Sequence, residues 1–449
     1  MDAALQERLL NSIENDRLVL FCGAGLSMST PSQVPSATEL TKICRETYAK
    51  DYGTTIPEAA AQDLEIMAEY FSARALLVPT FINRLIPRGP FLRGPNEGHY
   101  AIADFLATGI IDFVASTNVD ALTEVAAEDL GESQAFVALD AAEANIPRLH
   151  RQHVKLHGCL RRKDNETVWC KSQLLKEPLQ SRLADLDTWL RAHLVGRDVI
   201  FLGFWSDWSY LNKIFEKSID AIDGGLVLIV NPSDDATLAE KAPTLWAWSG
   251  NGRSERFVVH QSAAEFLDDL RRLIWANFLT RMLEQGAEAY ACLTGASTGR
   301  PTVPPDLSAE DVYRLKEDAC GAPAKTVSRV KRPTPSLNMA GAVHVGLTIN
   351  GAMHEGSGYR LDGKRIRILN AQGQLLTSFR SRFHGEPTPF NPADLLICVG
   401  AKDDGGVAID IARGNKNRST VVRPATVGEW MTEDQAAQFW RPAANVASS

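Results

Sequence analysis

Three features are missing from this chain of 449 residues, and each absence excludes a class of protein. Because no run of ~18–20 uninterrupted apolar residues is present, we expect no membrane-spanning helix. The start, Met1-Asp2-Ala3-Ala4, has neither the basic nor the apolar region of a secretory signal, so we expect a cytoplasmic protein. The seven cysteines are odd in number and scattered, which is typical of neither a disulfide framework nor a zinc knuckle.

An excess of positive charge is also missing from the chain as a whole. The net charge of −8 argues against nonspecific binding to nucleic acid. The segment from Lys325 to Arg423 is different, because its 15 Lys and Arg residues outnumber its 7 Asp and Glu residues. Two interpretations are open: ordinary solvated charge on a small domain, or a surface for an anion, a nucleotide or an acidic partner.

What the sequence does contain is a regular alternation of strands and helices. Short apolar runs, typical of buried parallel strands, occupy residues 18–22, 111–115, 153–156, 199–202, 226–230 and 257–259. Helix-like segments lie between them, at residues 58–84, 98–106, 121–130, 174–194, 208–222 and 262–283. The pattern predicts a doubly wound, Rossmann-like α/β domain with a parallel sheet and helical insertions over residues 1–285.

The remainder of the chain has a different composition. Residues 286–336 contain many Pro, Ser, Thr and Lys residues, which favours a linker with one short helix at 309–319. Strand-like segments follow at residues 343–349, 365–369, 375–383, 395–399 and 407–411. We therefore expect a small β-rich domain over residues 337–449.

Four short segments stand at the ends of predicted strands. They are Gly23-Ala24-Gly25-Leu26-Ser27, Ser116-Thr117-Asn118-Val119-Asp120, Lys155-Leu156-His157-Gly158 and Gly203-Phe204-Trp205-Ser206-Asp207. Because open α/β sheets bind ligands beyond the carboxyl ends of their strands, we expect all four segments to line one crevice.

The glycine segment can hold a phosphate or simply make a turn. Gly23 and Gly25 would let the backbone approach a pyrophosphate, with Ser27 as a hydroxyl donor. A plain tight turn explains the same residues, because the third glycine of the usual dinucleotide motif is missing.

The next two segments offer groups for chemistry on a sugar. Asn118 and Asp120 can bind ribose hydroxyls or hold a water beneath the anomeric carbon, or they can cap the following helix. His157 carries the side chain best suited to proton transfer near neutral pH, although a histidine at a strand end is often structural. We expect structural roles for His99, inside a helical pattern, and for His153, at the start of a strand.

The last candidates follow two further strands. Ser206 can donate to a phosphate or a ribose hydroxyl, and Asp207 can cap the helix that begins there. Asn231 follows the apolar run 226–230 and can bind the adenosine ribose, or form a turn with Pro232.

The ordered set of four motifs resembles the sirtuin family over about residues 15–275. This resemblance implies NAD as the ligand and Asn118, Asp120 and His157 as the reactive cluster. It further implies the following NAD contacts: Gly23, Ala24, Gly25, Ser27, Thr117, Gly203, Ser206, Asp207 and Asn231.

The chain also departs from the protein-deacylating sirtuins. These hold a structural zinc through two Cys-x-x-Cys pairs after the catalytic histidine, whereas only Cys159 and Cys170 occur here, so we expect no zinc. The Gly-Ile-Pro-Asp-Phe-Arg continuation of the glycine loop is replaced by Gln33-Val34-Pro35-Ser36-Ala37. Because of these two losses and the helical insert at 171–194, the chain resembles bacterial sirtuin-like effectors that hydrolyse NAD in antiphage defence.

That resemblance implies a regulated NAD+ glycohydrolase of abortive infection, which releases nicotinamide with ADP-ribose or a cyclised form of it. Because unregulated loss of NAD kills the cell, we expect an off state, a homo-oligomer and a sensor partner. A HerA-type ATPase, a short Argonaute or a nucleotide-sensing protein would suit, and residues 337–449 would mediate assembly or partner binding. Two alternatives stay open: a zinc-free protein deacylase or ADP-ribosyltransferase, and a noncatalytic sensor of NAD or ADP-ribose.

Overall fold

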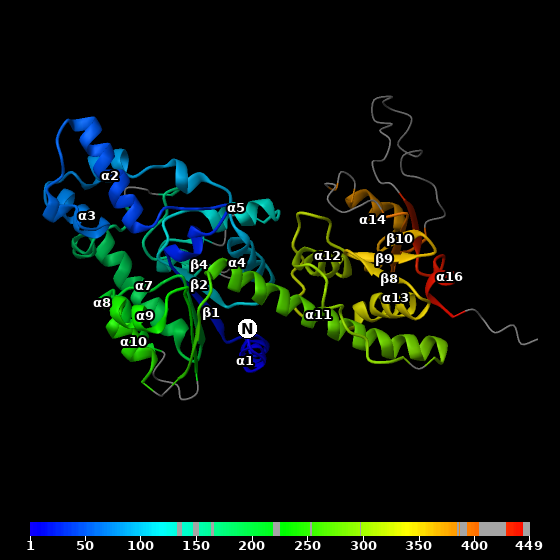
Figure 1. The fold of residues 1–449 in the computed structure, drawn as a ribbon. Helices are drawn as coiled ribbons and strands as arrows, with labels where there is room; N and C mark the ends of the chain where they lie inside the picture. The colour runs from blue at the N-terminus through cyan, green and yellow to red at the C-terminus, as the bar shows by residue number, and fades with distance from the viewer. Residues whose placement is uncertain are drawn as a thin grey trace, which may run out of the picture. The chain divides into compact units, whose positions relative to one another are not determined.

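The computed structural model describes residues 1–132, 137–146, 152–162, 166–218, 225–251, 254–296, 298–383, 386, 393–403 and 428–442. The chain divides into two compact units, Met1–Asp269 and Leu270–Ser449 (Figure 1). Within the described ranges, no helix combines the length and the apolar character that crossing a membrane requires.

A seven-stranded sheet forms the centre of the first unit, and every strand pair in it is parallel. Its strands are β1 (Leu18–Cys22), β2 (Phe113–Ser116), β3 (Val137–Ala138), β4 (Gln152–Lys155), β5 (Asp198–Leu202), β6 (Leu226–Val230) and β7 (Glu255–Val259). In space the order is β3-β4-β2-β1-β5-β6-β7, so the predicted doubly wound α/β fold is confirmed. The strands β2, β3 and β4 lie on one side of β1, and β5, β6 and β7 lie on the other side. The strand order therefore switches between β1 and β5.

Helices cover both faces of this sheet. Side chains alternate between faces along a strand, so Val19 and Phe21 of β1 join one core with residues of α7, α8 and α10, whereas α1 and α4 contact β1 and β2. The helical elements are α1 (Ala3–Glu14), η1 (Ala24–Met28), α2 (Ala37–Tyr52), η2 (Glu58–Ala60), α3 (Leu64–Ser72), η3 (Leu77–Leu85), η4 (Gly89–Leu92), α4 (Glu97–Thr108), α5 (Leu122–Asp129), α6 (Ala141–Ala144), η7 (Lys171–Leu175), α7 (Leu179–Leu194), α8 (Ser209–Ser218), α9 (Asp235–Lys241), α10 (Pro243–Ser249) and α11 (Ala263–Thr294).

Two of the predicted helices are interrupted. The prediction of one continuous helix over 58–84 is wrong, because the structure divides this stretch into η2, α3 and η3. Ala75 has a left-handed φ of 57° between α3 and η3, which no helix can continue through. The predicted helix over 174–194 begins only at Leu179, directly after Pro178.

The second unit contains a mixed sheet of five strands in the order β12-β11-β10-β9-β8. β8 (Met353–Glu355), β9 (Gly358–Leu361) and β10 (Lys364–Asn370) pair antiparallel, and β11 (Leu395–Val399) and β12 (Glu429–Thr432) continue it in parallel. The predicted strands at 365–369 and 395–399 and the helix α12 (Ala309–Ala319) are confirmed. The predicted strand at 407–411 lies outside the described residues.

Two other predicted strands of this unit are helices, which corrects the prediction. Residues 343–349 belong to α13 (Asn338–Ile349), and 375–383 to α14 (Leu376–Arg382), beside the short η8 (Pro335–Leu337) and α16 (Ala437–Trp440). Every residue of α13 from Ala340 to Leu347 is buried, so no polar stripe reveals its helical period. The chain of α13 also passes very close to α11, since a Cβ on Gly286 would lie 2.2 Å from the carbonyl carbon of Gly341.

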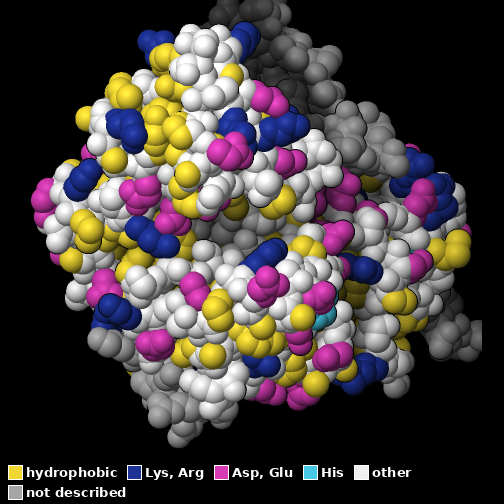
Figure 2. Space-filling model, turned by 60° about the vertical axis from the view of Figure 1, so that its left-hand side comes forward, with side chains coloured by type: hydrophobic (Ala, Val, Ile, Leu, Met, Phe, Trp, Pro, Cys, Tyr) yellow, Lys and Arg dark blue, Asp and Glu magenta, His cyan; other side chains and the backbone are white. Residues whose placement is uncertain are grey.

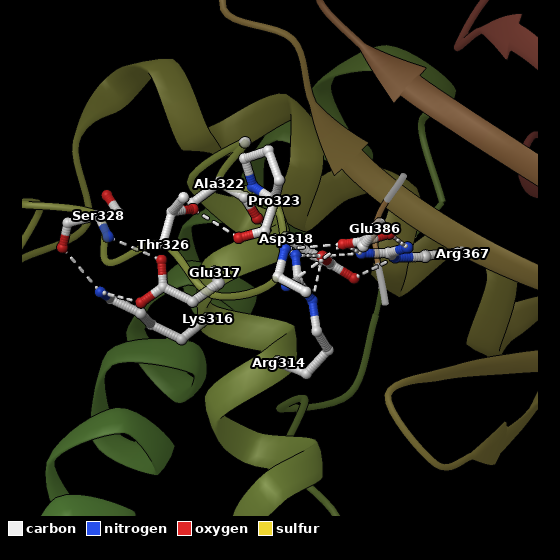
Figure 3. Close-up of polar contacts among 12 residues, drawn as sticks. Arg314, Lys316, Glu317, Asp318, Ala322, Pro323, Thr326, Ser328, Arg367 and Glu386 are labelled. Atoms are coloured by element: carbon white, nitrogen blue, oxygen red, sulfur yellow. Dashed lines mark hydrogen bonds and ion pairs between the residues drawn. The ribbon is translucent and has the colours of Figure 1, made fainter. Parts of the chain in front are cut away.

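Three cationic side chains of this unit, Arg314, Lys316 and Arg367, pair with carboxylates within it (Figure 3). Arg367 of β10 donates to Asp318 at 2.7 and 2.8 Å and to Glu386 at 2.8 and 3.0 Å. Arg314 of α12 also binds Asp318, and the side chains of Arg314 and Asp318 are 3% and 2% exposed. This buried network fastens α12 to the sheet, so these two arginines are not available to an outside anion.

Candidate functional site

The register of the sheet sets the two central candidates side by side in the topology. β2 and β4 are paired strands in which Ser116 stands opposite Lys155. Asn118 and His157 each follow two residues later, beyond the carboxyl ends of these neighbouring strands. Both side chains are buried, at 9% and 5% exposure. Asn118 and His157 therefore both lie beyond the carboxyl ends of adjacent parallel strands.

The glycines at the switch point bring two loops into main-chain contact. The amide of Gly23 donates to the carbonyl of Leu202, and that of Gly25 to the carbonyl of Gly203, both at 3.0 Å. A Cβ on Gly23 would lie 2.6 Å from Phe204 Cα, and Gly203 has a left-handed φ of 59°. Glycine is thus required here by backbone contact. Both amides are already engaged, whereas Ala24 between them is exposed and its amide has no hydrogen-bond partner within the described part of the chain.

The hydroxyl of Ser27 is the centre of a buried network. It donates to Asp120 Oδ2 at 2.8 Å and accepts from Asn118 Nδ2 at 3.2 Å. It also contacts His99 Nε2 at 3.2 Å. The second oxygen of Asp120 accepts from the amide of Leu122 at 3.1 Å, at the start of α5. Each carboxylate oxygen of Asp120 thus accepts one hydrogen bond within the protein, and these two bonds fix its orientation.

His99 fulfils a structural role and also belongs to this network. It completes a capping box at the start of α4, where its Nδ1 accepts from the amide of Asn96 at 3.1 Å. Because Nδ1 is an acceptor, the ring proton lies on Nε2 and is donated to Ser27. Burial lowers the pKa of His99 to about 4, against the opposing charges of Asp120 and Glu124. The ring is therefore neutral at pH 7.

The buried side chain of Lys155 contacts the main chain and an acidic side chain of the same region. Its ammonium group binds the carbonyl oxygen of Asp120 and lies 2.9 Å from Glu124 Oε1. The two charged side chains are 1% and 4% exposed, and the Cys159 thiol donates to the same Glu124 oxygen at 3.4 Å. The buried pair fixes the main chain that carries Asn118 and Asp120.

His157 is enclosed by aromatic side chains. Its Nε2 lies 2.9 Å from the hydroxyl oxygen of Tyr210, and its ring centroid is 4.7 Å from that of Trp208. Burial lowers the pKa of His157 to about 3, and the nearby guanidinium of Arg182 lowers it further. Nδ1 has no hydrogen-bond partner among the described residues. The imidazole is therefore neutral, with one nitrogen occupied.

Two of the other predicted contact residues, Asp207 and Asn231, accept hydrogen bonds from main-chain amides of the protein. Asp207 accepts from the amides of Thr244 and Leu245 at 3.0 and 3.1 Å, so it caps α10 and not the helix that follows it in the chain. Partial burial raises the pKa of Asp207, but these amide bonds lower it by more. Asn231 Oδ1 accepts from the amide of Ser233 at 3.0 Å, the turn foreseen as its alternative role.

Thr117 and Ser206 complete the predicted set. Thr117 donates from its amide to the carbonyl of Cys22 at 3.0 Å, next to the glycine loop. Ser206 is exposed, and its hydroxyl has no partner among the described residues. The Oδ1 of Asn118 also accepts no hydrogen bond from the residues that the structure describes, so Ser206, the Ala24 amide and this oxygen offer donors and acceptors suited to phosphate and ribose oxygens. The face turned to the viewer in Figure 2 is hollowed between hydrophobic and charged side chains.

The two cysteines that follow His157 are separate, free thiols. Cys159 lies near Lys155 and Glu124, and Cys170 begins the turn at η7. Across the described part of the chain, no group of three or more His, Cys, Asp and Glu side chains is arranged to hold a metal ion.

Sequence reasoning missed four residues of this region: His99 as a network member, Lys155, Tyr210 and Arg182. A signal existed for the first, because Asn96 with His99 three residues later has the spacing of a capping box. Lys155 was inside a recognised motif, but nothing in the sequence indicates that its side chain turns inward. Tyr210 and Arg182 come from helices that only the tertiary packing brings to His157.

Comparison with known proteins gives matches to solved structures and to one family model. A search of curated proteins found no significant match. Among solved structures, a Sir2 homologue in complex with NAD is 16% identical with a TM-score of 0.32, covering 60% of this chain and 93% of its own. A second solved structure, described as the structural basis for the mechanism and regulation of Sir2 enzymes, is 16% identical with a TM-score of 0.34. This match covers 60% of this chain and 97% of the other chain. Residues 112–251 match the model of the SIR2-like domain. Residues 112–251 are thus similar to the SIR2-like domain.

Proposed function

We propose that this protein is an NAD+ glycohydrolase that cleaves the bond between nicotinamide and ribose. The observation that carries the proposal is the shared hydroxyl of Ser27. It holds the Asn118 amide, 3.2 Å away, beside the strand whose end carries His157. The available groups of Asn118, Ala24 and Ser206 suit the ribose and phosphate oxygens of NAD.

The chemistry requires a water, a sugar carbon and a base. As the glycosidic bond breaks, positive charge develops on the ribose, and the Oδ1 of Asn118 holds a water against the anomeric carbon. His157 accepts a proton at its free Nδ1 from that water or from a ribose hydroxyl. NAD+ and water thereby yield nicotinamide, ADP-ribose and one proton.

The test is NAD turnover by the full chain, followed by mass spectrometry of the products. Asn118→Ala and His157→Ala should each lower kcat by about 10²-fold or more, the effect expected of positioned proton transfer and orientation. Asn15→Ala and His260→Ala, at exposed sites, are the matched controls. Unchanged turnover in both site variants would overturn the assignment. Tight NAD binding without turnover would favour a sensor.

We further propose that the enzyme acts as a regulated effector of abortive infection in bacterial antiphage defence. The argument is that free NAD hydrolysis destroys the host cell, so an off state is required. The predicted control lies in residues 337–449, through self-assembly or a sensor such as a HerA-type ATPase, a short Argonaute or a nucleotide-sensing protein. Mass photometry and NAD turnover, with and without proteins from neighbouring genes, test it. Full activity of an isolated monomer would contradict regulation by assembly.

A further inference from the structure

The hydroxyl of Tyr210 connects His157 to a second depression in the surface. Tyr210 lies near the start of α8, and its hydroxyl oxygen is 2.9 Å from His157 Nε2. The same side chain borders a groove between η7, α7 and α8, together with Leu174, Leu183, Ser209 and Lys213. The groove has an apolar floor and an exposed rim, because Ser209 and Lys213 are exposed. Tyr210 is therefore the one described side chain that both contacts the imidazole and lines this groove.

His157 is poorly suited to keep a proton that it accepts. Its ring is 5% exposed and lies close to the guanidinium of Arg182. Arg182 itself is enclosed: its side chain is 9% exposed, it lies 3.7 Å from Glu166, and its Nε has no partner among the described residues. An imidazolium at His157 would be desolvated and would face a like charge, which explains a pKa of about 3. A proton arriving at Nδ1 has to leave again from Nε2.

We propose that Tyr210 is a proton relay that carries the proton from His157 into the groove. This inference rests on the proposed NAD hydrolysis. A substrate hydroxyl or water gives its proton to Nδ1 of His157, while Nε2 passes its own proton to the Tyr210 oxygen. The phenolic proton of Tyr210 leaves at the same time for water in the groove. One proton enters and one leaves, so neither residue keeps a charge. His157 ends with its proton on Nδ1, and after product release it gives that proton to water while Nε2 regains one through Tyr210 from water in the groove.

Replacing the hydroxyl alone gives the first test. Tyr210→Phe keeps the ring and should lower kcat by about 10²-fold, the lower end for positioned proton transfer, with KM for NAD nearly unchanged. Tyr100→Phe is the matched control, because its hydroxyl also makes one hydrogen bond, at 2.9 Å to Asp129. The solvent deuterium isotope effect on kcat should change only in Tyr210→Phe. An unchanged kcat would overturn the relay, and so would an increase, which would make the hydroxyl a restraint on His157.

Chemical rescue separates a relay from simple space filling. Tyr210→Ala leaves room for a small aromatic molecule beside the groove. Added phenol should restore part of kcat, whereas anisole, of similar shape but without a hydroxyl proton, should not. Equal restoration by both compounds would show a packing role and would overturn the relay.

The tautomer of His157 provides a test that needs no turnover. The relay requires the neutral ring to carry its proton on Nε2, which nitrogen-15 NMR of the full chain can measure. Tyr210→Phe should shift the Nε2 signal and leave that of His260 in place. If the wild-type proton is on Nδ1, the relay is wrong even if NAD is hydrolysed. If NAD is not hydrolysed by the wild-type protein, the proposed function fails on its own evidence, and the relay fails with it.

Discussion

Ser27 and Asp120, 93 positions apart in the chain, are joined by a 2.8 Å hydrogen bond inside the first unit. The serine hydroxyl has one proton to give and two lone pairs to offer. It gives the proton to Asp120 and accepts from Asn118 and His99, so its capacity is fully used. Its three neighbours are held by one oxygen atom, which makes this serine the point at which the site is most easily disturbed.

The first prediction concerns that oxygen atom. Ser27→Ala frees the Asn118 amide and leaves the buried Asp120 oxygen without its donor, which costs about 1–3 kcal/mol of stability. NAD turnover should fall by about 10-fold or more, because Asn118 is no longer fixed. Steady-state kinetics and urea unfolding measure the two effects. Ser29→Ala in the same loop is the control, and an equal loss there would contradict the role of Ser27.

The second prediction concerns acid. His99 and His153 have pKa values of about 4 in the folded protein, below the usual 6.5, chiefly because they are buried. Between pH 4 and pH 6.5 the unfolded chain binds more protons at these two histidines than the folded protein does. The free energy of unfolding therefore falls as the pH drops from 6.5 towards 4. His153→Leu, which removes a buried ring without hydrogen-bond partners among the described residues, should reduce this slope by up to about 1.4 kcal/mol per pH unit.

Urea unfolding between pH 4 and pH 8 measures this slope. His260→Gln, at an exposed site, is the control for replacing a histidine. A slope in His153→Leu equal to that of the wild type would show that the ring does not stay neutral in the folded protein.

A third prediction concerns the buried pair beneath Asp120. Lys155→Met leaves Glu124 as an unpaired charge and should destabilise the protein by about 3–5 kcal/mol. Adding Glu124→Gln should recover part of this loss, since the orphaned charge is removed. Denaturant unfolding of the wild type, of Lys155→Met and Glu124→Gln singly and of the double variant gives the coupling energy. Lys42→Met, from an exposed pair 4.0 Å apart, should cost less than about 1 kcal/mol.

The fourth prediction tests the second unit. Asp318→Asn weakens the contacts to Arg314 and Arg367 at once and leaves excess positive charge buried, so a loss of about 3 kcal/mol is expected. Asp434→Asn removes a carboxylate that pairs with Arg441 at an exposed site and should cost about 0.5 kcal/mol or less. Hydrogen exchange of α12 and β10 should rise only in the first variant.

The central sheet could be predicted because its strands are buried on both faces. Such strands are short, continuous apolar runs, as at Leu18–Cys22 and Leu226–Val230. The polar residues that directly follow these runs are therefore predicted to lie at the carboxyl edge of the sheet. The neighbouring positions of Asn118 and His157 follow from that pattern and the register of β2 and β4.

What could not be predicted depends on contacts between distant segments. His99 and Ser27 are 72 positions apart, and Tyr210 and His157 are 53 apart, so no local pattern links them. The alternation of Val343, Val345, Leu347 and Ile349 with other residues predicts a strand where the structure has the helix α13. Its burial on nearly all sides erased the polar face that would have identified it.

The interlocked glycine loops constrain how any ligand reaches the switch point. Two main-chain hydrogen bonds tie the segment after β1 to the segment after β5, and Gly203 leaves no room for a side chain between them. Moving these two segments apart would have to break both hydrogen bonds at once, so we expect the backbone after β1 and the backbone after β5 to shift together as one unit.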